Sequence, residues 1–477
     1  MTSIFFKKQQ RSAYNLPRDE PCWTYDQPPD SLLRQQPLPL PSCSELELMR
    51  HFSGLAQKNI GIDTHAYFLG SCTMKLNPRI NEWAASLPAF LESHPLAPEE
   101  LVQGNLRIMG ELIEFLASLT GMAGGSLLPN AGAQGEFAGI KMIRAFHRSK
   151  GDLERTQVLV PDSAHGTNPA TAHLAGFEVV PIRSDGEGEM DLEELQAHLS
   201  PKTAALMLTN PSTLGLFSRR IEQIADLVHR AGGRLYYDGA NLNAIMEIVR
   251  PGHMGFDVMH INLHKTFSTP HGGGGPGSGP VLCSHELLPF LPLPRVVRKA
   301  EGWKLLWDTP DSIGQLASFH GNFAIVVRGY LYARLHGKSG LRRVSEMAVV
   351  HANYLKTKLQ TLFKAPFSRF CMHEFILQMD RFAHHSIGAW DLAKRLLDYG
   401  FHAPTVHFPL IVPEAFLIEP TETEAKPRLD AFVEALRTIA IEAEEEPERV
   451  KTAPHSLSVG RLDEVCAARY PHLQDVW

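Results

Sequence analysis

The chain has 477 residues, of which 46 are Lys or Arg and 52 are Asp or Glu, so its formal net charge is −6 with neutral histidines. This mildly acidic balance gives no indication of a nucleic-acid or membrane partner. The six cysteines are scattered without CxxC spacing, which favours a reduced, cytoplasmic protein and supports neither a metal site nor a disulfide framework. The first ten residues hold too short an apolar run for a secretory signal, and no run of 18 apolar residues predicts a membrane helix.

Residues 1–60 are predicted to form an extended N-terminal arm. The segment Pro37-Leu-Pro-Leu-Pro41 favours an extended path without a core of its own. A disordered leader is the alternative. The apolar side chains of this stretch favour an arm that wraps on a partner, because they would otherwise be exposed.

A polar, turn-prone segment follows, Tyr67-Phe-Leu-Gly-Ser-Cys-Thr-Met-Lys-Leu-Asn-Pro78. Its hydroxyl groups and its lysine are typical of a loop near a site, which makes Thr73 and Lys75 candidate site residues. Cys72 could be a nucleophile, but no activating histidine can be identified from the spacing. A small buried or loop cysteine is the simpler interpretation.

Helical spacing begins at Leu101, and the small-residue run Leu128–Glu136 leads into a second helix. The N–H groups at such a helix start suit a phosphate, although the same pattern is a common helix cap. Strands and helices then alternate, which predicts a mostly parallel sheet with helical crossovers. The predicted strands are 156–160, 177–182, 204–208, 235–237, 256–263 and 279–283, and the predicted helices are one from a capping box at Asp191 and Glu194 and one over 220–229.

Residues 61–330 are therefore expected to form a large α/β domain and residues 331–477 a smaller α+β domain. A helix is predicted over 312–333, at the end of the large domain. The predicted helices of the smaller domain are 341–362, 389–397 and 428–442, and its predicted strands are 375–379 and 417–419.

Two strand ends carry the chemistry of pyridoxal phosphate (PLP), which needs an amine for its aldehyde and an acid for its ring nitrogen. Asp238 follows Leu-Tyr-Tyr, and Lys265 follows a second apolar strand 27 residues later (265 − 238), next to His264. Asp238 and Ala240 point to the same face of an extended strand, so one can meet the ring nitrogen while the other lies under the ring. A turn-capping aspartate and a solvated lysine are the simpler alternatives.

Further polar residues also follow strand ends, where open α/β sheets bind ligands. His165 could stack on the PLP face opposite Ala240 and move protons, or be a core histidine. Asn210 could reach the cofactor, or belong to an Asn-Pro turn. The run Gly272–Gly279 is interpreted as a lid or a place of close backbone approach rather than a flexible connection.

Five motifs resemble the glycine decarboxylase (P-protein) family of the glycine cleavage system, and more closely subunit 2 of its split form. They are Ser71–Lys75, Asn130–Glu136, Asp162–Pro169, Tyr236–Asn241 and His264–Gly275, and the similarity extends from about Gly61 to the end of the chain.

The resemblance implies a fold-type-I PLP enzyme in which Lys265 holds the cofactor and Asp238 contacts its ring nitrogen. His165 and Ala240 would sandwich the ring, and Gly132, Ala133 and Gln134 would take the phosphate. The implied reaction is decarboxylation of glycine with transfer of the aminomethyl group to the lipoyl arm of H-protein. Thr73, Lys75 and His271 are candidates for holding the glycine carboxylate or for lining the lipoyl channel.

The split form also implies a homologous subunit 1 and an α2β2 heterotetramer. Two alternatives stay open at this point. One is another fold-type-I enzyme, such as an aminotransferase or a cysteine-desulfurase-like protein, since one fold supports many chemistries. The other is a non-catalytic scaffold subunit, against which the intact Lys265 and Asp238 argue.

Overall fold

The computed structural model describes residues 29–36, 43–271 and 277–471, which fall into two compact units. Residues 62–453 form the larger unit, and the residues before and after them form the smaller one. No helix in the described part of the chain is long and apolar enough to cross a membrane.

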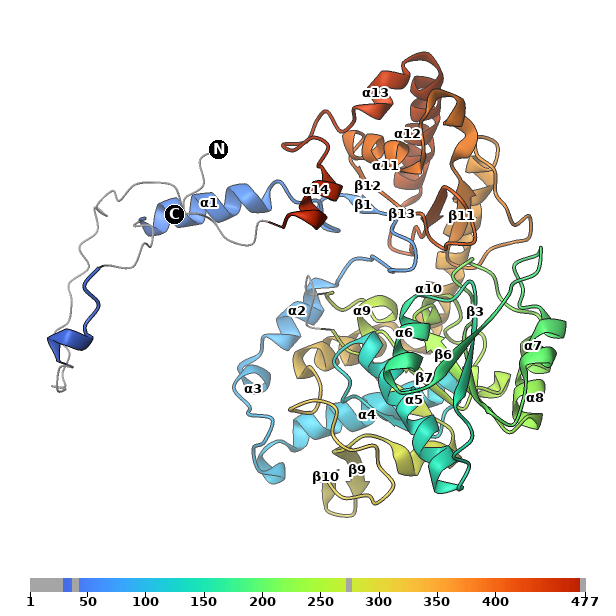
Figure 1. Ribbon diagram of the computed structural model, residues 1–477. Helices are drawn as coiled ribbons and strands as arrows, with labels where there is room; N and C mark the ends of the chain where they lie inside the picture. Colours follow the sequence, from blue (N-terminus) through green and yellow to red (C-terminus); the bar gives the residue numbers. More distant parts are fainter. Residues whose placement is uncertain (1–28, 37–42, 272–276, 472–477) are drawn as a thin grey trace. The chain divides into compact units, whose positions relative to one another are not determined.

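A seven-stranded sheet with the order β2-β8-β7-β6-β5-β3-β4 forms the framework of the larger unit (Figure 1). Its strands are β2 (Gly124–Ser126), β3 (Gln157–Pro161), β4 (Glu178–Ile182), β5 (Thr203–Thr209), β6 (Arg234–Gly239), β7 (Val258–Ile261) and β8 (Val281–Cys283). The strands from β3 to β7 pair in parallel, whereas β8 runs antiparallel to both β7 and β2. The predicted mostly parallel sheet is confirmed.

Alternate residues of the central strands enter two separate hydrophobic cores, because successive side chains of a strand point to opposite faces. Leu206 and Tyr237 pack with α4, α8 and α10 on one face, and Met207 and Tyr236 pack with α5 and α6 on the other. These helices are α4 (Gln103–Thr120), α5 (Gly132–Ser149), α6 (Thr167–Leu174), α8 (Ile221–Arg230) and α10 (Phe323–Leu359). Helices thus cover both faces of the sheet, as parallel strands require.

The C-terminal part of this unit has a core of its own and an antiparallel sheet in the order β11-β14-β13. Its elements are β11 (Phe375–Gln378), α11 (Ala389–Asp398), β12 (Phe401–His402), β13 (Thr405–Val406), β14 (Ala415–Ile418), α12 (Lys426–Glu445) and α13 (Pro447–Lys451). Figure 1 shows α11, α12 and α13 grouped together. The two-residue strand β1 (Ala66–Tyr67) pairs in parallel with β12, so the start of the unit joins its C-terminal part.

The remaining elements of the larger unit are short. They are α2 (Arg79–Ala85), α3 (Pro88–Leu91), η3 (Glu99–Leu101), α7 (Leu192–His198), η4 (Leu242–Ala244), η5 (Pro251–Met254), α9 (Leu263–Thr266), η6 (His285–Phe290), β9 (Arg295–Lys299), β10 (Gly302–Leu306) and η7 (Asp380–His385).

Two predicted helix starts need correction. The helix predicted over 312–333 begins only at Phe323 and continues to Leu359, with a kink at Gly337, whose φ of 57° suits glycine. The predicted boundary between residues 330 and 331 falls inside this helix, so the division into 61–330 and 331–477 stays a prediction. Asp191 does cap α7, but Glu194 does not complete a capping box, because its carboxylate accepts hydrogen bonds from Arg183.

The smaller unit contains η2 (Asp30–Leu32), α1 (Glu45–Ala56) and α14 (Glu464–Arg469). The segment predicted as an extended arm therefore includes a helix of 12 residues. A capping box starts this helix, in which the Ser44 N–H donates to Glu47 and the Glu47 N–H donates to the Ser44 hydroxyl. Residues 1–28 and 37–42 of the predicted arm lie outside the described residues.

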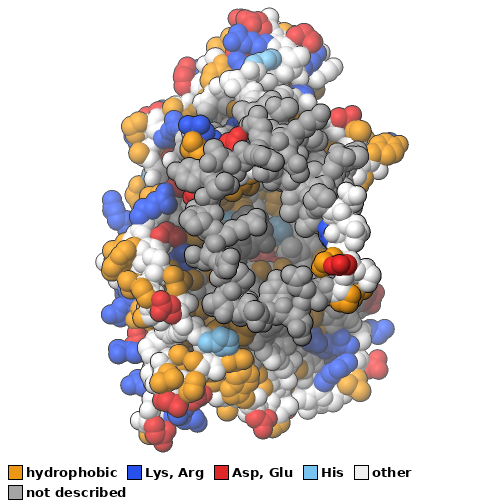
Figure 2. Space-filling model, turned by 90° about the vertical axis from the view of Figure 1, so that its left-hand side faces the viewer, with side chains coloured by type: hydrophobic (Ala, Val, Ile, Leu, Met, Phe, Trp, Pro, Cys, Tyr) orange, Lys and Arg blue, Asp and Glu red, His pale blue; other side chains and the backbone are white. Residues whose placement is uncertain are grey.

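The surface is mixed in character. On the face drawn in Figure 2, basic and acidic side chains of the described residues are interspersed, and hydrophobic side chains lie among them.

Candidate functional site

A cavity of ≈ 170 Å³ lies at the carboxyl ends of the parallel strands. The residues predicted from the sequence that line it are Gly132, Ala133, His165, Asp238, Ala240, His264 and Lys265. The chain brings them together from segments far apart in the sequence, because the carboxyl ends of parallel strands meet at one edge of the sheet.

Lys265 lies in α9, a single helical turn that follows β7. The strand predicted to reach Leu263 ends at Ile261, and Asn262 precedes the turn. The Lys265 Nζ atom donates a hydrogen bond to the Ser71 carbonyl oxygen at 2.7 Å. Its amine is therefore held at the cavity by the loop before α2, in the motif that also contains Thr73 and Lys75.

Asp238 is almost fully buried, with 3% of its surface exposed. Its carboxylate accepts from the Ala240 N–H at 3.0 Å and from the Asn168 amide at 3.1 Å, and His260 Nε2 lies 3.5 Å from it. Burial raises the pKa of Asp238, but His260, the Ala240 N–H, Lys265 and Asn168 together hold that pKa below its usual range. Asp238 thus presents a fixed negative charge to the cavity.

The start of α5 forms another part of the cavity wall, although it stands more than 100 residues before Asp238 (238 − 132). A Cβ atom at Gly132 would lie 2.3 Å from Asn262 Oδ1, so only glycine fits there. Gly132 and Ala133 line the cavity, whereas Gln134 is not one of the described residues that line it. Its side chain instead accepts from the Asn130 N–H at 2.6 Å and donates to the Leu316 carbonyl at 2.9 Å.

Asn210 is another predicted cofactor ligand whose side chain the structure does not place at the cavity. It is fully buried, and its Oδ1 atom accepts from the Ser218 N–H at 2.8 Å. The cavity is instead lined here by Thr209 and Thr213. The interpretation of Asn210 as part of a local turn fits this arrangement better than a role as ligand.

Thr73, Lys75 and His271 are the candidates for holding the glycine carboxylate or lining the lipoyl channel. Thr73 and Lys75 are buried and do not line the cavity, and His271 lies next to the lining residue His264. Thr73 is 2% exposed and Lys75 is 4% exposed. The His271 ring lies 5.0 Å from the His264 ring, and its Nδ1 atom is 3.7 Å from Cys72 Sγ.

The histidine near Cys72 that the spacing could not identify is therefore His271, 199 residues away along the chain. Burial raises the pKa of Cys72, which keeps its thiol protonated at neutral pH.

Lys75 belongs to a buried polar network. Its Nζ atom donates to Asn243 Oδ1 and to Glu422 Oε1, each at 2.8 Å, and to the Tyr332 hydroxyl at 3.3 Å. Burial lowers the pKa of Lys75, but Glu422 and Tyr332 raise it to a net value above the usual range. An ammonium group held by three partners has no free donor for a substrate.

Replacing Lys75 by methionine is expected to lower the free energy of unfolding by about 3–5 kcal/mol, because the Glu422 carboxylate would stay buried without its cation. The KM for glycine of the folded variant should be unchanged. Urea denaturation measures the stability, and Lys426→Met is the control, since its pair with Asp430 is exposed and screened by solvent. A stable Lys75→Met variant with a raised KM would restore Lys75 as a substrate ligand.

Several lining residues had no role in the sequence interpretation, namely Ser71, Glu136, Thr167, His260 and Asn262. Glu136 is 3% exposed, its Oε1 atom lies 2.6 Å from Thr167 Oγ1, and its Oε2 atom accepts from Asn168 Nδ2 at 2.9 Å. Burial and the charge of Asp238 raise the pKa of Glu136 to about 7. Glu136 belongs to the motif Asn130–Glu136 and Thr167 to the motif Asp162–Pro169. Membership in these motifs is the signal by which the sequence could have identified them as site residues.

A second pair of buried carboxyl groups, Glu374 and Glu419, lies next to the backbone of Ser71. The Ser71 N–H donates to Glu374 at 2.7 Å, and Glu374, Glu419 and His373 bring one polar atom each within 4.8 Å of the others. All three side chains are fully buried. Burial and Glu419 raise the pKa of Glu374 well above its usual range, and burial raises the pKa of Glu419 to about 7.

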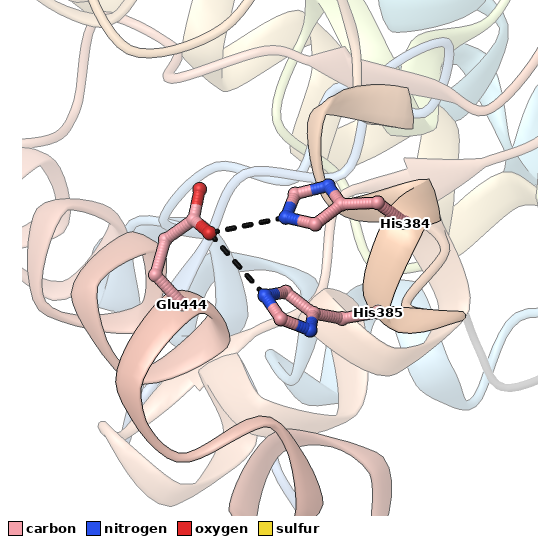
Figure 3. A group of neighbouring side chains, drawn as sticks. All are labelled: His384, His385 and Glu444. Atoms are coloured by element: carbon pink, nitrogen blue, oxygen red, sulfur yellow. Dashed lines mark hydrogen bonds and ion pairs between the residues drawn. The ribbon is translucent and has the colours of Figure 1, made fainter.

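An exposed cluster joins His384 and His385 of η7 to Glu444 of α12 (Figure 3). Both Nε2 atoms face the same carboxylate oxygen, at 3.2 and 3.4 Å. None of these residues lines the cavity described above. The two imidazoles therefore share one carboxylate partner at the surface.

Comparisons with known proteins identify two family matches and close relatives over nearly the whole chain. A family described as glycine dehydrogenase, C-terminal domain, matches residues 344–457, and the aminotransferase class-V family matches residues 143–291. The chain is 55% identical over 98% of both chains to a probable glycine dehydrogenase (decarboxylating) subunit 2 of Caldanaerobacter subterraneus subsp. tengcongensis. A protein of the same description from Methylococcus capsulatus is 57% identical over 93% of this chain and 92% of its own length.

A solved structure shares the fold. It is described as glycine decarboxylase (P-protein) of the glycine cleavage system in inhibitor-bound form, with a TM-score of 0.73, 21% identity, and coverage of 86% of this chain and 93% of that chain. The sheet, its flanking helices and the C-terminal α+β part are thus those of fold-type-I PLP enzymes, as the sequence predicted.

Proposed function

This chain belongs to the family of glycine dehydrogenase (decarboxylating) subunit 2, and on that premise we propose how its cavity serves the PLP-dependent decarboxylation of glycine. It is an enzyme subunit of the glycine cleavage system. The observation that carries the proposal is the meeting of an amine, Lys265, and an ionised buried carboxylate, Asp238, in one cavity. Family membership at this identity sets aside the aminotransferase, desulfurase and scaffold alternatives.

The residues present fit the cofactor. Lys265 would hold the aldehyde and Asp238 the ring nitrogen, and the start of α5, where Gly132 and Ala133 line the cavity, would hold the phosphate. When bound, PLP supplies an aldehyde for the substrate amine and a ring that takes up the electron pair released with CO2. His165 and Ala240 are proposed to lie against opposite faces of the ring.

Each protein group has a defined task in this proposal. The fixed charge of Asp238 keeps a proton on the ring nitrogen, which makes the ring an electron acceptor. The Ser71 carbonyl accepts a hydrogen bond from the Lys265 amine and so holds that amine at the cavity. His264, whose pKa burial lowers to about 3, stays neutral and adds no charge beside Lys265.

A partner subunit is implied by the designation of the relatives as subunit 2. We propose that the partner is the homologous subunit 1 in an α2β2 assembly, that the aminomethyl group passes to the lipoyl arm of H-protein, and that the enzyme works in the cytoplasm. The five cysteines in the described ranges are all free, which agrees with a reducing compartment.

Helix α1 supports a partner contact. Leu46, Met49 and Phe52 follow one another at three-residue spacing and are 56%, 59% and 54% exposed. Apolar side chains of this size on one stripe of a helix are typical of an interface. The arm predicted to wrap on a partner thus includes helix α1, and we propose that α1 packs against subunit 1.

Phe52→Ser is expected to weaken assembly with subunit 1 by about 1.5–3 kcal/mol, roughly a tenfold to hundredfold loss of affinity, because the burial of one aromatic side chain is lost. Sedimentation of the mixed subunits measures this. His51→Ser, a change at the neighbouring polar position, is the control. Equal affinities of the Phe52 variant and the wild type would remove α1 from the interface.

The experiment that tests the proposed function is exchange of the glycine carboxyl carbon with labelled bicarbonate. The assay is run with lipoylated H-protein, with and without subunit 1. Exchange that needs both proteins is the expected result. Transfer of the glycine amino group to PLP, giving pyridoxamine phosphate that then reacts with a 2-oxo acid, without release of CO2 from glycine, would contradict it.

A further inference from the structure

We propose that Glu136, Thr167 and His165 form a proton relay that delivers the proton taken up when the acceptor disulfide is opened. This inference rests on the lipoyl acceptor of the proposed function and assigns two residues, Glu136 and Thr167, that the mechanism above leaves unused. All three line the cavity.

The geometry of the relay is continuous. Glu136 Oε1 lies 2.6 Å from Thr167 Oγ1, and Thr167 Oγ1 lies 2.8 Å from His165 Nδ1. Glu136 is in the first turn of α5, Thr167 begins α6, and His165 stands between β3 and α6. Both distances are in the range through which hydrogen bonds pass protons between heavy atoms.

The hydrogen-bond count places a proton on Glu136. The Thr167 N–H donates to His165 Nδ1 at 3.2 Å, so Nδ1 is unprotonated and the ring carries its hydrogen on Nε2. The Thr167 hydroxyl has one hydrogen for two neighbours, Nδ1 and Glu136, which would otherwise both be acceptors. Both contacts become hydrogen bonds when Glu136 is the acid, donating to Thr167, which then donates to His165.

The charges around Glu136 favour its protonated form at neutral pH. Asp238 is linked to it through Asn168 Nδ2, which lies 2.9 Å from Glu136 and 3.1 Å from Asp238. Two buried carboxyl groups that share a neighbour are not both readily ionised. The titratable and charged groups that face this region are Asp238, Lys265, His165, His260 and Tyr236.

The relay completes the proton balance of the transfer. As the carbon that has lost CO2 bonds to one lipoyl sulfur, the sulfur–sulfur bond breaks and its electron pair passes to the second sulfur. That sulfur takes the Nε2 proton of His165, Nδ1 takes the Thr167 proton, and Thr167 takes the Glu136 proton. The disulfide is reduced by the electron pair released in carbon–carbon cleavage. The relay is restored when His165 Nε2 takes a proton from solvent and the Nδ1 proton returns through Thr167 to Glu136. The imidazole is never charged, in keeping with the lowered pKa that burial gives His165.

Matched variants of Thr167 test the relay. Thr167→Val removes the hydroxyl at nearly constant volume and is expected to lower kcat for transfer to lipoylated H-protein by about 10²-fold, a common contribution of acid–base catalysis. Thr167→Ser restores a hydroxyl and should recover most of the turnover. Wild-type turnover in Thr167→Val, or an equal loss in Thr167→Ser, would overturn the relay.

Glu136→Gln gives the pH test. The relay needs the acid form, so wild-type kcat should fall as pH rises through the pKa of Glu136 at about 7. The glutamine side chain keeps a hydrogen-bonding group but carries no transferable proton, so this variant should have low activity and lack that descending limb. An unchanged limb in Glu136→Gln would contradict the proposal.

Two measurements on the cofactor-free protein need no turnover. Infrared difference spectra between the wild type and Glu136→Gln should show a protonated carboxylic acid C=O band at pH 6. The ¹⁵N spectrum of labelled histidine should show His165 with its hydrogen on Nε2. A Glu136 carboxylate at pH 6, or hydrogen on Nδ1, would overturn the inference. If the proposed function itself is wrong, glycine fails to change the cofactor absorbance of the wild type, whereas failure of the relay alone leaves that change intact in Thr167→Val.

Discussion

Replacing Lys265 by alanine is expected to abolish the Schiff-base absorbance of bound PLP and to lower glycine decarboxylation by at least about 10³-fold. The amine of Lys265 is the one that the cavity lining offers within the described residues. Alanine keeps the helical turn α9 and removes a single side-chain hydrogen bond, to the Ser71 carbonyl. The loss should therefore come from chemistry rather than from unfolding, and thermal melting checks this.

Two controls sharpen this result. Added ethylamine should restore part of the turnover in Lys265→Ala, because a small amine can enter the space that the side chain vacates and act in place of Nζ. Lys202→Ala, at an exposed lysine, should leave absorbance and turnover at wild-type levels. Normal absorbance in Lys265→Ala would show that another lysine holds the cofactor.

The residues that sequence reasoning placed correctly at the cavity share one physical signal. Asp238 directly follows a run of apolar residues in a buried strand, His165 stands four residues after the end of β3, and Lys265 lies in the helical turn that follows β7. Because parallel strands end at the same edge of the sheet, local patterns of this kind are enough to predict that distant residues meet. The small-residue start of α5 was detectable for a similar local reason.

Gln134 and Asn210 show where this reasoning ends. Both stand next to residues that line the cavity, yet each satisfies nearby backbone groups instead. The choice between a ligand and a cap is made by side-chain direction, which spacing along the chain does not specify. Short polar side chains often bond to nearby backbone, so the residue type alone favours neither outcome.

The partners of Lys75 and Cys72 were missed for a different reason. The partner of Lys75, Glu422, is 347 residues away, and the partner of Cys72, His271, is 199 residues away. Contacts of this range are set by how the C-terminal part and the loop after β7 pack on the segment before α2. Local periodicity does not indicate such contacts. The sequence therefore predicted a lysine in a loop near a site where the structure has a buried ion pair between Lys75 and Glu422.

Asp238→Asn is expected to retain PLP but to lower decarboxylation by about 10²- to 10³-fold, the usual effect of removing one preorganised electrostatic group. The carboxylate has a lowered pKa and is ionised at the pH of the reaction. An amide of the same shape can accept from the Ala240 N–H but cannot keep a proton on the ring nitrogen. Cofactor absorbance after gel filtration reports retention, and bicarbonate exchange reports the chemistry.

The variant should fold, because the surrounding hydrogen bonds can adapt. The new amide would face the Asn168 amide donor, but Asn168 Oδ1 is buried without a partner in the described part of the chain, so rotation of the Asn168 amide offers an acceptor. Asp257→Asn, at a buried carboxylate outside the cavity lining, is the matched control and should keep its turnover. Near-normal exchange in Asp238→Asn would mean that the ring nitrogen needs no negative partner, and the assignment of Asp238 would have to be withdrawn.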